Sequence, residues 1–281
     1  MERLRLGDLE LEYVVRGAND LRGAGEPVIL IHPGIFTDWF TPLLPEAALN
    51  RYRLVHYHRQ GCAGSRRLSG PVSLADHAEH ARRLMQHLGL HRAHVVGHSS
   101  SGNVALQLAL DSPEYVQSLA ILEPALMSVP SAATARQFVA TAREAHQAGD
   151  PARAIDIFMR GVCGPDYRTT LDRVLPGGFA GYVKDADTFF EQEFPALQQW
   201  SFRPEDAKRI FHPTLAVVGA RSLQMSPIWG ERQQVLLDWL PNVEAFVLPG
   251  AGHLLQIENA VGMAEALGEF FGRHGFARLL A

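Results

Sequence analysis

Short apolar runs alternate with helical patterns along most of the chain. Continuous runs bounded by glycine, proline or polar residues are typical of strands that are buried on both faces of a sheet. We predict such strands at residues 28–31, 53–57, 94–96, 118–122, 214–218 and 243–248. Helical spacing of apolar residues predicts helices at residues 73–88, 103–110, 227–239 and 260–273. Strands that alternate with helices imply right-handed crossovers, and therefore a mostly parallel α/β sheet covered by helices on both faces.

The first residues show a different period. Residues 4–15 alternate apolar and polar side chains, which predicts an antiparallel hairpin at one edge of the sheet. A glycine-rich turn at residues 17–25 follows it. At the first predicted helix, Ser73 is a plausible N-cap with Asp76 three positions later, and Gly89 is placed to end the helix.

Residues 125–208 break the alternation. They contain no clear buried strand, and helical patterns at 132–148 and 152–159 are followed by segments that proline and glycine interrupt. We expect a helical cap inserted after the sixth strand. The predicted domains are a core of residues 1–124 and 209–281, and a cap of residues 125–208.

Composition limits the classes of function. The 281 residues are 47% hydrophobic and carry a net charge of −4, so the chain can bury a sizeable core and has no basic footprint for nucleic acid. Cys62 and Cys163 lie far apart, which does not suggest a disulfide framework. The first six residues lack the apolar core of a signal peptide, and no run approaches the length of a membrane helix. We expect a cytoplasmic protein with a small-molecule substrate, and neither a nucleic-acid nor a membrane partner.

Candidate chemistry is concentrated in the sequence Val-Val-Gly-His-Ser-Ser-Ser-Gly-Asn at residues 95–103. A predicted strand turns here into a predicted helix, which is the context of a nucleophile elbow. So tight a turn requires small residues two positions before and two positions after the nucleophile. Only Ser99 meets this requirement, with Gly97 before it and Ser101 after it.

A serine hydroxyl needs a neighbouring base to become a good nucleophile. His253, in the glycine-bearing loop after the last predicted strand, is the best candidate. His77, with two further histidines of the same predicted helix, is interpreted as part of a solvated face. His56 and His58 form no cluster at metal-ligand spacing, so no metal site is predicted.

These motifs resemble the α/β-hydrolase superfamily over nearly the whole chain. The resemblance is carried by the elbow at 97–102, the Gly-Ala-Gly-His sequence at 250–253 and the motifs His32-Pro33-Gly34 and Arg59-Gln60-Gly61. The chain order of serine and histidine also fits. The resemblance implies an α/β-hydrolase fold and a catalytic triad.

The third triad residue departs from the pattern of that superfamily. Most members carry an aspartate in the loop after the seventh strand, where this chain has Ser222. Some members instead carry the acid at the end of the sixth strand, where this chain has Glu123. A glutamate directly after an apolar strand is costly to bury unless its charge is used, so we favour Glu123 over a solvated loop residue. Glu258 is the remaining candidate, with a supporting role in the His253 loop as the simpler interpretation.

The resemblance also indicates an oxyanion hole. One donor is expected to be the backbone N–H of Ser100, and the other that of Gly34, with Ile35 as a close alternative. Pro33 lacks an N–H and is excluded. Aromatic residues after Gly34 and in the cap suggest an apolar substrate pocket. The candidates for its lining are Ile35, Phe36, Trp39, Phe138, Phe158 and Trp200.

Together these residues predict a serine hydrolase for a small, largely apolar ester-like substrate, working without a cofactor. A serine nucleophile argues against the aspartate-dependent dehalogenases and epoxide hydrolases of the superfamily. Carboxylesterases, lactonases, thioesterases, C–C bond hydrolases and aminopeptidases stay open. Two alternatives are a binding or signalling protein on the same fold, which Ser222 supports, and a lyase or acyltransferase.

Overall fold

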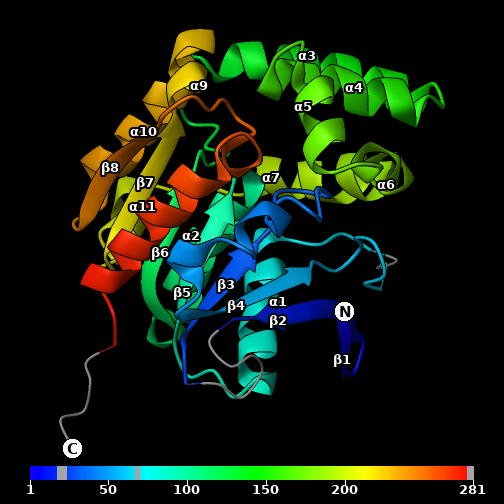
Figure 1. Cartoon of the computed structure of the whole chain (residues 1–281). Helices are drawn as coiled ribbons and strands as arrows, with labels where there is room; N and C mark the ends of the chain where they lie inside the picture. Colours follow the sequence, from blue (N-terminus) through cyan, green and yellow to red (C-terminus); the bar gives the residue numbers. More distant parts are fainter. Residues whose placement is uncertain (18–23, 67–69, 277–281) are drawn as a thin grey trace, which may run out of the picture.

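The computed structural model describes residues 1–17, 24–66 and 70–276, so most of the predicted glycine-rich turn lies outside the described residues. Eight strands form one sheet in the order β1-β2-β4-β3-β5-β6-β7-β8 (Figure 1). The two pairs β1–β2 and β2–β4 are antiparallel, and all later pairs are parallel. The strands are β1 (Glu2–Leu6), β2 (Leu9–Arg16), β3 (Glu26–Ile31), β4 (Tyr52–His58), β5 (Ala93–His98), β6 (Val116–Leu122), β7 (Thr214–Gly219) and β8 (Val243–Leu248).

Helices cover both faces of this sheet because its central strands are apolar on both sides. In β3, Ile29 and Ile31 belong to one core cluster, whereas Val28 and Leu30 belong to the other. The first cluster includes residues of α1 (Leu74–His87) and α2 (Ser100–Asp111), and the second includes residues of α11 (Ala260–Arg273). The predicted α/β sheet with helices on both faces is therefore confirmed.

The helix α1 begins as the sequence indicates. The Ser73 hydroxyl accepts a hydrogen bond from the Asp76 backbone N–H, and the Asp76 carboxylate accepts one from the Ser73 N–H. This reciprocal capping satisfies backbone donors that would otherwise lack partners at the first turn. Gly89, just beyond the helix, has φ +67°.

The segment between β6 and β7 is helical throughout its regular structure and lies above the carboxyl ends of the strands (Figure 1). Besides α3 (Ala132–Gln147) and α4 (Pro151–Cys163), it contains several short helices that sequence patterns do not predict. These are α5 (Tyr167–Val174), α6 (Gly178–Lys184), a π-helical segment (Thr188–Glu193), α7 (Phe194–Gln199) and α8 (Pro204–Ala207).

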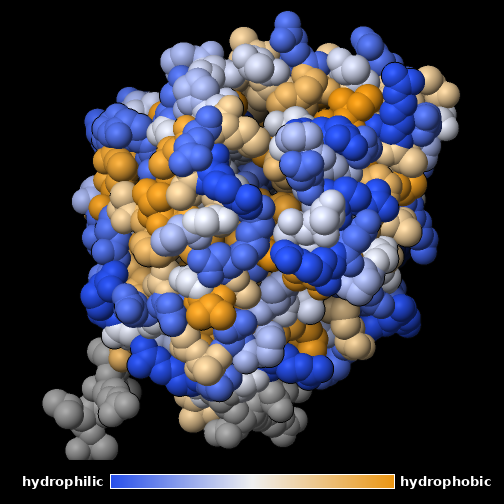
Figure 2. Space-filling view, turned by 45° about the horizontal axis from the view of Figure 1, so that its top comes forward, coloured by the Kyte–Doolittle hydropathy of each residue, from blue (hydrophilic) through white to orange (hydrophobic). Residues whose placement is uncertain are grey.

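After β7 the chain forms a short helix, α9 (Ala220–Met225), and then α10 (Pro227–Trp239), whose bounds match the predicted helix. No helix of the described residues is long and apolar enough to cross a membrane. On the face in Figure 2, hydrophobic residues are interspersed with hydrophilic ones.

Candidate active site

Ser99 lies in a strained turn between β5 and α2. Its φ of 53° and ψ of −124° place a non-glycine residue at positive φ, which persists only where the surrounding structure enforces it. A Cβ added to Gly97 would lie 2.1 Å from the Ser101 carbonyl oxygen, and one added to Gly102 would lie 3.0 Å from Pro124. The small residues of the motif are thus required by the close approach of backbone and neighbours.

His253 lies in the turn after β8 and is held by a carboxylate. Its Nδ1 is 2.5 Å from Glu123 Oε2. The imidazole packs between two rings, with centroids 4.3 Å from Trp229 and 4.8 Å from His98. Burial and the nearby His253 lower the pKa of His98 well below its usual value, so His98 contributes a neutral ring to this packing.

Glu123 directly follows β6 and uses both carboxylate oxygens. While Oε2 faces His253, Oε1 accepts a 2.7 Å hydrogen bond from the Gly219 N–H at the end of β7. The side chain has no exposed surface, and the backbone has φ 41°. The carboxylate is thus held by hydrogen bonds on both oxygens rather than solvated.

The structure also places Ser222 and Glu258, the other two positions that the sequence raises for the acid. Ser222 lies in α9, fully buried, and its Oγ has no hydrogen-bond partner among the described residues. Glu258 accepts a 2.5 Å hydrogen bond from the Gly252 N–H and pairs with Arg221. It thereby braces the loop that carries His253.

Ser99 and His253 line the same cavity, whose volume is about 260 Å³. No hydrogen bond joins the two side chains in the described structure; such contacts are often long in ligand-free enzymes and shorten when substrate binds. Most other lining side chains are apolar. They include Phe36, Trp39, Phe138, Val139, Phe158, Met159, Phe189, Leu197, Met225, Ile228 and Trp229.

Four of the six predicted pocket residues are therefore found in the lining. Ile35 is fully buried but belongs to the core beside the cavity rather than to its lining. Trp200 is not in the lining either, because its ring stacks on Phe202 and its Nε1 donates to Gln107. Aromatic composition does not separate the lining of a cavity from the packing behind it.

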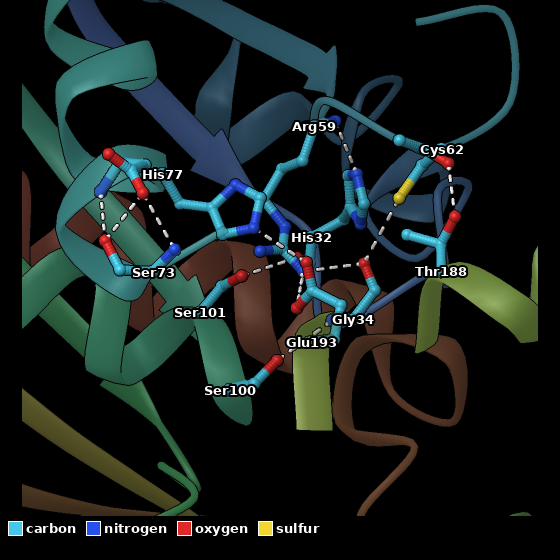
Figure 3. Close-up of polar contacts among 12 residues, drawn as sticks. His32, Gly34, Arg59, Cys62, Ser73, His77, Ser100, Ser101, Thr188 and Glu193 are labelled. Atoms are coloured by element: carbon cyan, nitrogen blue, oxygen red, sulfur yellow. Dashed lines mark hydrogen bonds and ion pairs between the residues drawn. The ribbon is translucent and has the colours of Figure 1, made fainter. Parts of the chain in front are cut away.

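The two expected oxyanion donors are adjacent. The Gly34 N–H donates a 3.0 Å hydrogen bond to the Ser100 hydroxyl, and both residues line the cavity. The Gly34 carbonyl accepts a 2.7 Å hydrogen bond from Arg59 on its other side. Figure 3 shows this arrangement, in which the loop after β3 is held against the first turn of α2.

A buried ionic network, which sequence patterns do not reveal, lies behind this loop (Figure 3). Arg59 Nη2 is 2.7 Å from one oxygen of Glu193, and His77 Nε2 is 2.8 Å from the other. Burial alone raises the pKa of Glu193, but the charge of Arg59 and the contacts with His77 outweigh it and lower the pKa to about 2. Glu193 also lines the cavity, so the network joins the helical segment above the sheet to the loop after β3.

The interpretation of His77 as a solvated residue is wrong. The side chain is buried because the π-helical segment places Glu193 opposite it. Its partner lies far along the chain, so the periodicity of α1 carries no signal of it.

Two groups of described residues bring possible metal ligands within 4.8 Å of one another. These groups are His98 with Glu123 and His253, and His146 with Asp187 and Glu191. In the first group the Glu123–His253 contact already uses a ligand atom of each residue. His56 and His58 belong to neither group.

The eight-stranded sheet, the elbow after β5 and the histidine loop after β8 define an α/β-hydrolase fold, as the resemblance in the motifs indicated. A family model described as the alpha/beta hydrolase fold matches residues 27–152. The enol-lactonase from Burkholderia xenovorans LB400 superimposes with a TM-score of 0.78 at 21% identity, over 96% of this chain and 100% of that one.

Two relatives found by sequence comparison are also named as hydrolases. The chain is 27% identical to the 2-hydroxymuconate semialdehyde hydrolase of Pseudomonas sp. CF600 over 268 residues, which is 88% of this chain and 87% of that protein. It is 34% identical to the RutD protein of Caulobacter vibrioides over 126 residues, 43% of this chain and 45% of RutD. The alignment with RutD thus spans less than half of that relative.

Proposed function

We propose that this protein is a serine hydrolase that cleaves a small, largely apolar ester-like substrate through an acyl-enzyme. The observation that carries the proposal is the buried Glu123–His253 contact beside a cavity that Ser99 also lines. A buried carboxylate that uses one oxygen on an imidazole and the other on a backbone N–H is costly without a role. Orienting a catalytic base is such a role.

In the proposed reaction, His253 accepts the proton of Ser99, and Ser99 attacks the ester-like carbonyl. Glu123 holds the imidazole in the tautomer that presents Nε2 to the serine, and stabilises the imidazolium that forms. The N–H groups of Ser100 and Gly34 receive the oxyanion of the tetrahedral intermediate. Rotation of the Ser100 hydroxyl away from Gly34 releases the second donor. The intermediate collapses to the acyl-enzyme as His253 gives its proton to the departing alcohol. Water then attacks the acyl-enzyme with His253 as base, and Ser99 regains its proton from His253 as the acid product leaves. No cofactor takes part.

Residues 125–208 act in this proposal as a cap. Their helices supply most of the apolar side chains of the cavity and lie above the strand ends that carry the triad (Figure 1). Excluding bulk water there strengthens the electrostatic interactions at the reacting carbonyl. The names of two similar proteins, a semialdehyde hydrolase and an enol-lactonase, support acyl chemistry at a site of this architecture.

A fluorophosphonate probe tests the proposal directly, because it labels only an activated serine. Peptide mapping of the wild-type protein should place the label on Ser99. Glu123→Gln should reduce the labelling rate by about 10³-fold or more, since loss of the triad acid costs several orders of magnitude. Ser222→Ala is the matched control and should label within about threefold of the wild type.

Other labelling results would contradict parts of the proposal. Unchanged labelling in Glu123→Gln contradicts the assignment of the acid. A folded wild-type protein that takes no label contradicts the hydrolase proposal, and favours a binding protein on this fold. Product analysis with and without an added alcohol distinguishes hydrolysis from acyl transfer.

A further inference from the structure

One side chain in the cavity wall has a charge that the proposed triad does not use. Arg232, on α10, is only 6% exposed and lines the cavity together with Ser99 and His253. Among the described lining residues it is the only arginine or lysine. A cation in an otherwise largely apolar wall is costly unless something compensates its charge.

The protein satisfies only part of this guanidinium. Nε donates a 2.9 Å hydrogen bond to the Leu126 carbonyl, and Nη2 makes a weak 3.6 Å contact with Met127 Sδ. Nη1 has no hydrogen-bond partner among the described residues, and none of their carboxylates lies within 4.0 Å of the guanidinium. Arginine has five N–H donors, so most of its planar fork is unfilled.

Nearby carboxylates are already engaged elsewhere. Glu193, which also lines the cavity, is bound by Arg59 and His77. Glu231, next to Arg232 in the chain, accepts hydrogen bonds from the backbone and hydroxyl of Ser131. Burial lowers the pKa of Arg232 to about 10, against the opposing effect of Glu123 and Glu231, so the side chain is positively charged at neutral pH.

The charge lies close to the proposed reaction centre. The Arg232 Cζ is 5.2 Å from the centroid of the Trp229 ring, which itself stacks on His253 at 4.3 Å. The Trp229 ring therefore contacts both the cation and the His253 imidazole. Arg232 and Ser99 line the same cavity. A small molecule that binds Arg232 through an anionic group therefore presents another of its groups to Ser99.

We propose that Arg232 binds a carboxylate of the substrate, so that the preferred substrates carry one carboxylate in addition to the ester-like carbonyl. A planar guanidinium with a free end matches a carboxylate by paired hydrogen bonds. The proposal rests on the serine-hydrolase function proposed above and specifies its substrate class. The carboxylate accepts from the N–H donors that no carboxylate of the described residues reaches, and the apolar walls contact the carbon chain between the two groups.

Binding without turnover provides the test. In a Ser99→Ala background, isothermal titration calorimetry compares monomethyl adipate with methyl hexanoate, which has the same carbon chain without the carboxylate. The monoanion should bind about 10-fold to 100-fold more tightly, the range expected of hydrogen bonds to a charged group. Adding Arg232→Met should remove this preference and change the affinity for the neutral ester by less than about threefold.

Two further variants separate a direct contact from general effects. Arg136→Gln removes an exposed arginine that reaches the Met127 carbonyl, and should keep the preference. Arg232→Lys retains the charge without the planar fork and should keep part of it. If circular dichroism shows that Arg232→Met is not folded, the proposal is tested by the preference of the Ser99→Ala parent for the monoanion and by the reduced preference expected of Arg232→Lys.

Equal affinity of the parent for the two ligands would overturn the proposal. So would an equal loss of both affinities in Arg232→Met, because a purely structural arginine acts on both ligands alike. Since the titration requires no reaction, its failure is distinct from a failure of the hydrolase proposal, which the absence of label on Ser99 reports.

Discussion

Single residues of the site are held in backbone conformations that are rare among the other described residues. Four described non-glycine residues have positive φ, and three of them are Ser99, Glu123 and Leu255, two residues after His253. Each such residue costs about 1–3 kcal/mol of strain and persists only where its surroundings enforce it. At Glu123 the backbone with positive φ directs the carboxylate from the end of β6 towards the loop after β8, where it contacts His253.

Glu193 carries a buried charge on which the stability of the fold should depend. Glu193→Gln leaves the fully buried Arg59 without its counter-charge, and breaking a buried ion pair in this way costs about 3–5 kcal/mol. The free energy of unfolding in urea should fall by that amount. Glu191→Gln, on the same π-helical segment but exposed, is the control and should stay within about 0.5 kcal/mol of the wild type. Equal stability of the two variants would show that Arg59 does not depend on Glu193.

At the scale of elements, the site is built where strands end. Ser99 follows β5, Glu123 follows β6 and His253 follows β8, while Gly219 at the end of β7 donates to Glu123. Ligand sites of open α/β sheets lie at the carboxyl ends of the strands. In the elbow between β5 and α2 the backbone approaches itself closely, since a Cβ added to Gly97 would meet the Ser101 carbonyl.

Gly97→Ala should therefore damage the elbow. The added Cβ would lie 2.1 Å from a backbone oxygen that cannot move without displacing α2. We expect either loss of cooperative folding or a folded protein whose Ser99 no longer takes the fluorophosphonate label. Gly181→Ala is the matched control, because Gly181 lies in α6 with nothing within 4 Å of an added Cβ, and should raise stability by about 0.5–1 kcal/mol. Normal labelling of Gly97→Ala would contradict this view of the elbow.

The sequence predicts these core elements because the signal for each is local. Buried parallel strands are short apolar runs, and the bounds predicted for α10, β8 and α11 agree with the structure. The short helices from α5 to α8 are not predicted, because proline and glycine leave too few helical turns for a period of apolar residues to be recognised.

The residues of the site likewise divide into those with a local sequence signal and those without one. Ser99 and His253 have motifs of their own, and Glu123 draws attention as a charge directly after a buried strand. Arg232 and Glu193 have no local signal, because their significance comes from what surrounds them in space. No periodicity of α10 distinguishes an arginine in a cavity wall from one on the surface.

At the scale of the whole molecule, the core buries several neutral histidines. Burial and the nearby His58 lower the pKa of His56 to about 3, and burial lowers the pKa values of His32 and His98 well below the usual value. The unfolded chain protonates these residues near pH 6.5. Below that pH the unfolded state binds more protons than the folded state, so stability decreases as the pH falls.

His56→Phe should make this decrease shallower. Each such histidine contributes a slope of up to about 1.4 kcal/mol per pH unit, present below pH 6.5 and ending near its folded pKa of about 3. Free energies of unfolding in urea at pH 7.5, 6 and 4.5 measure the slope, with His87→Gln, an exposed histidine of α1, as control. The same slope in His56→Phe and in the wild type would contradict a neutral buried His56.

The placement of Glu123 makes the chain modular. Ser99 and Glu123 both precede residue 125 and follow neighbouring strands of the sheet. The helical segment of residues 125–208 therefore does not separate them in the sequence. An acid after β7 would instead follow that segment in the chain. We therefore expect a chimaera to accept residues 125–208 from another protein as a single segment and to keep the proposed nucleophile and the proposed acid in one uninterrupted stretch. The donor segment must also supply a carboxylate in the place of Glu193, opposite Arg59.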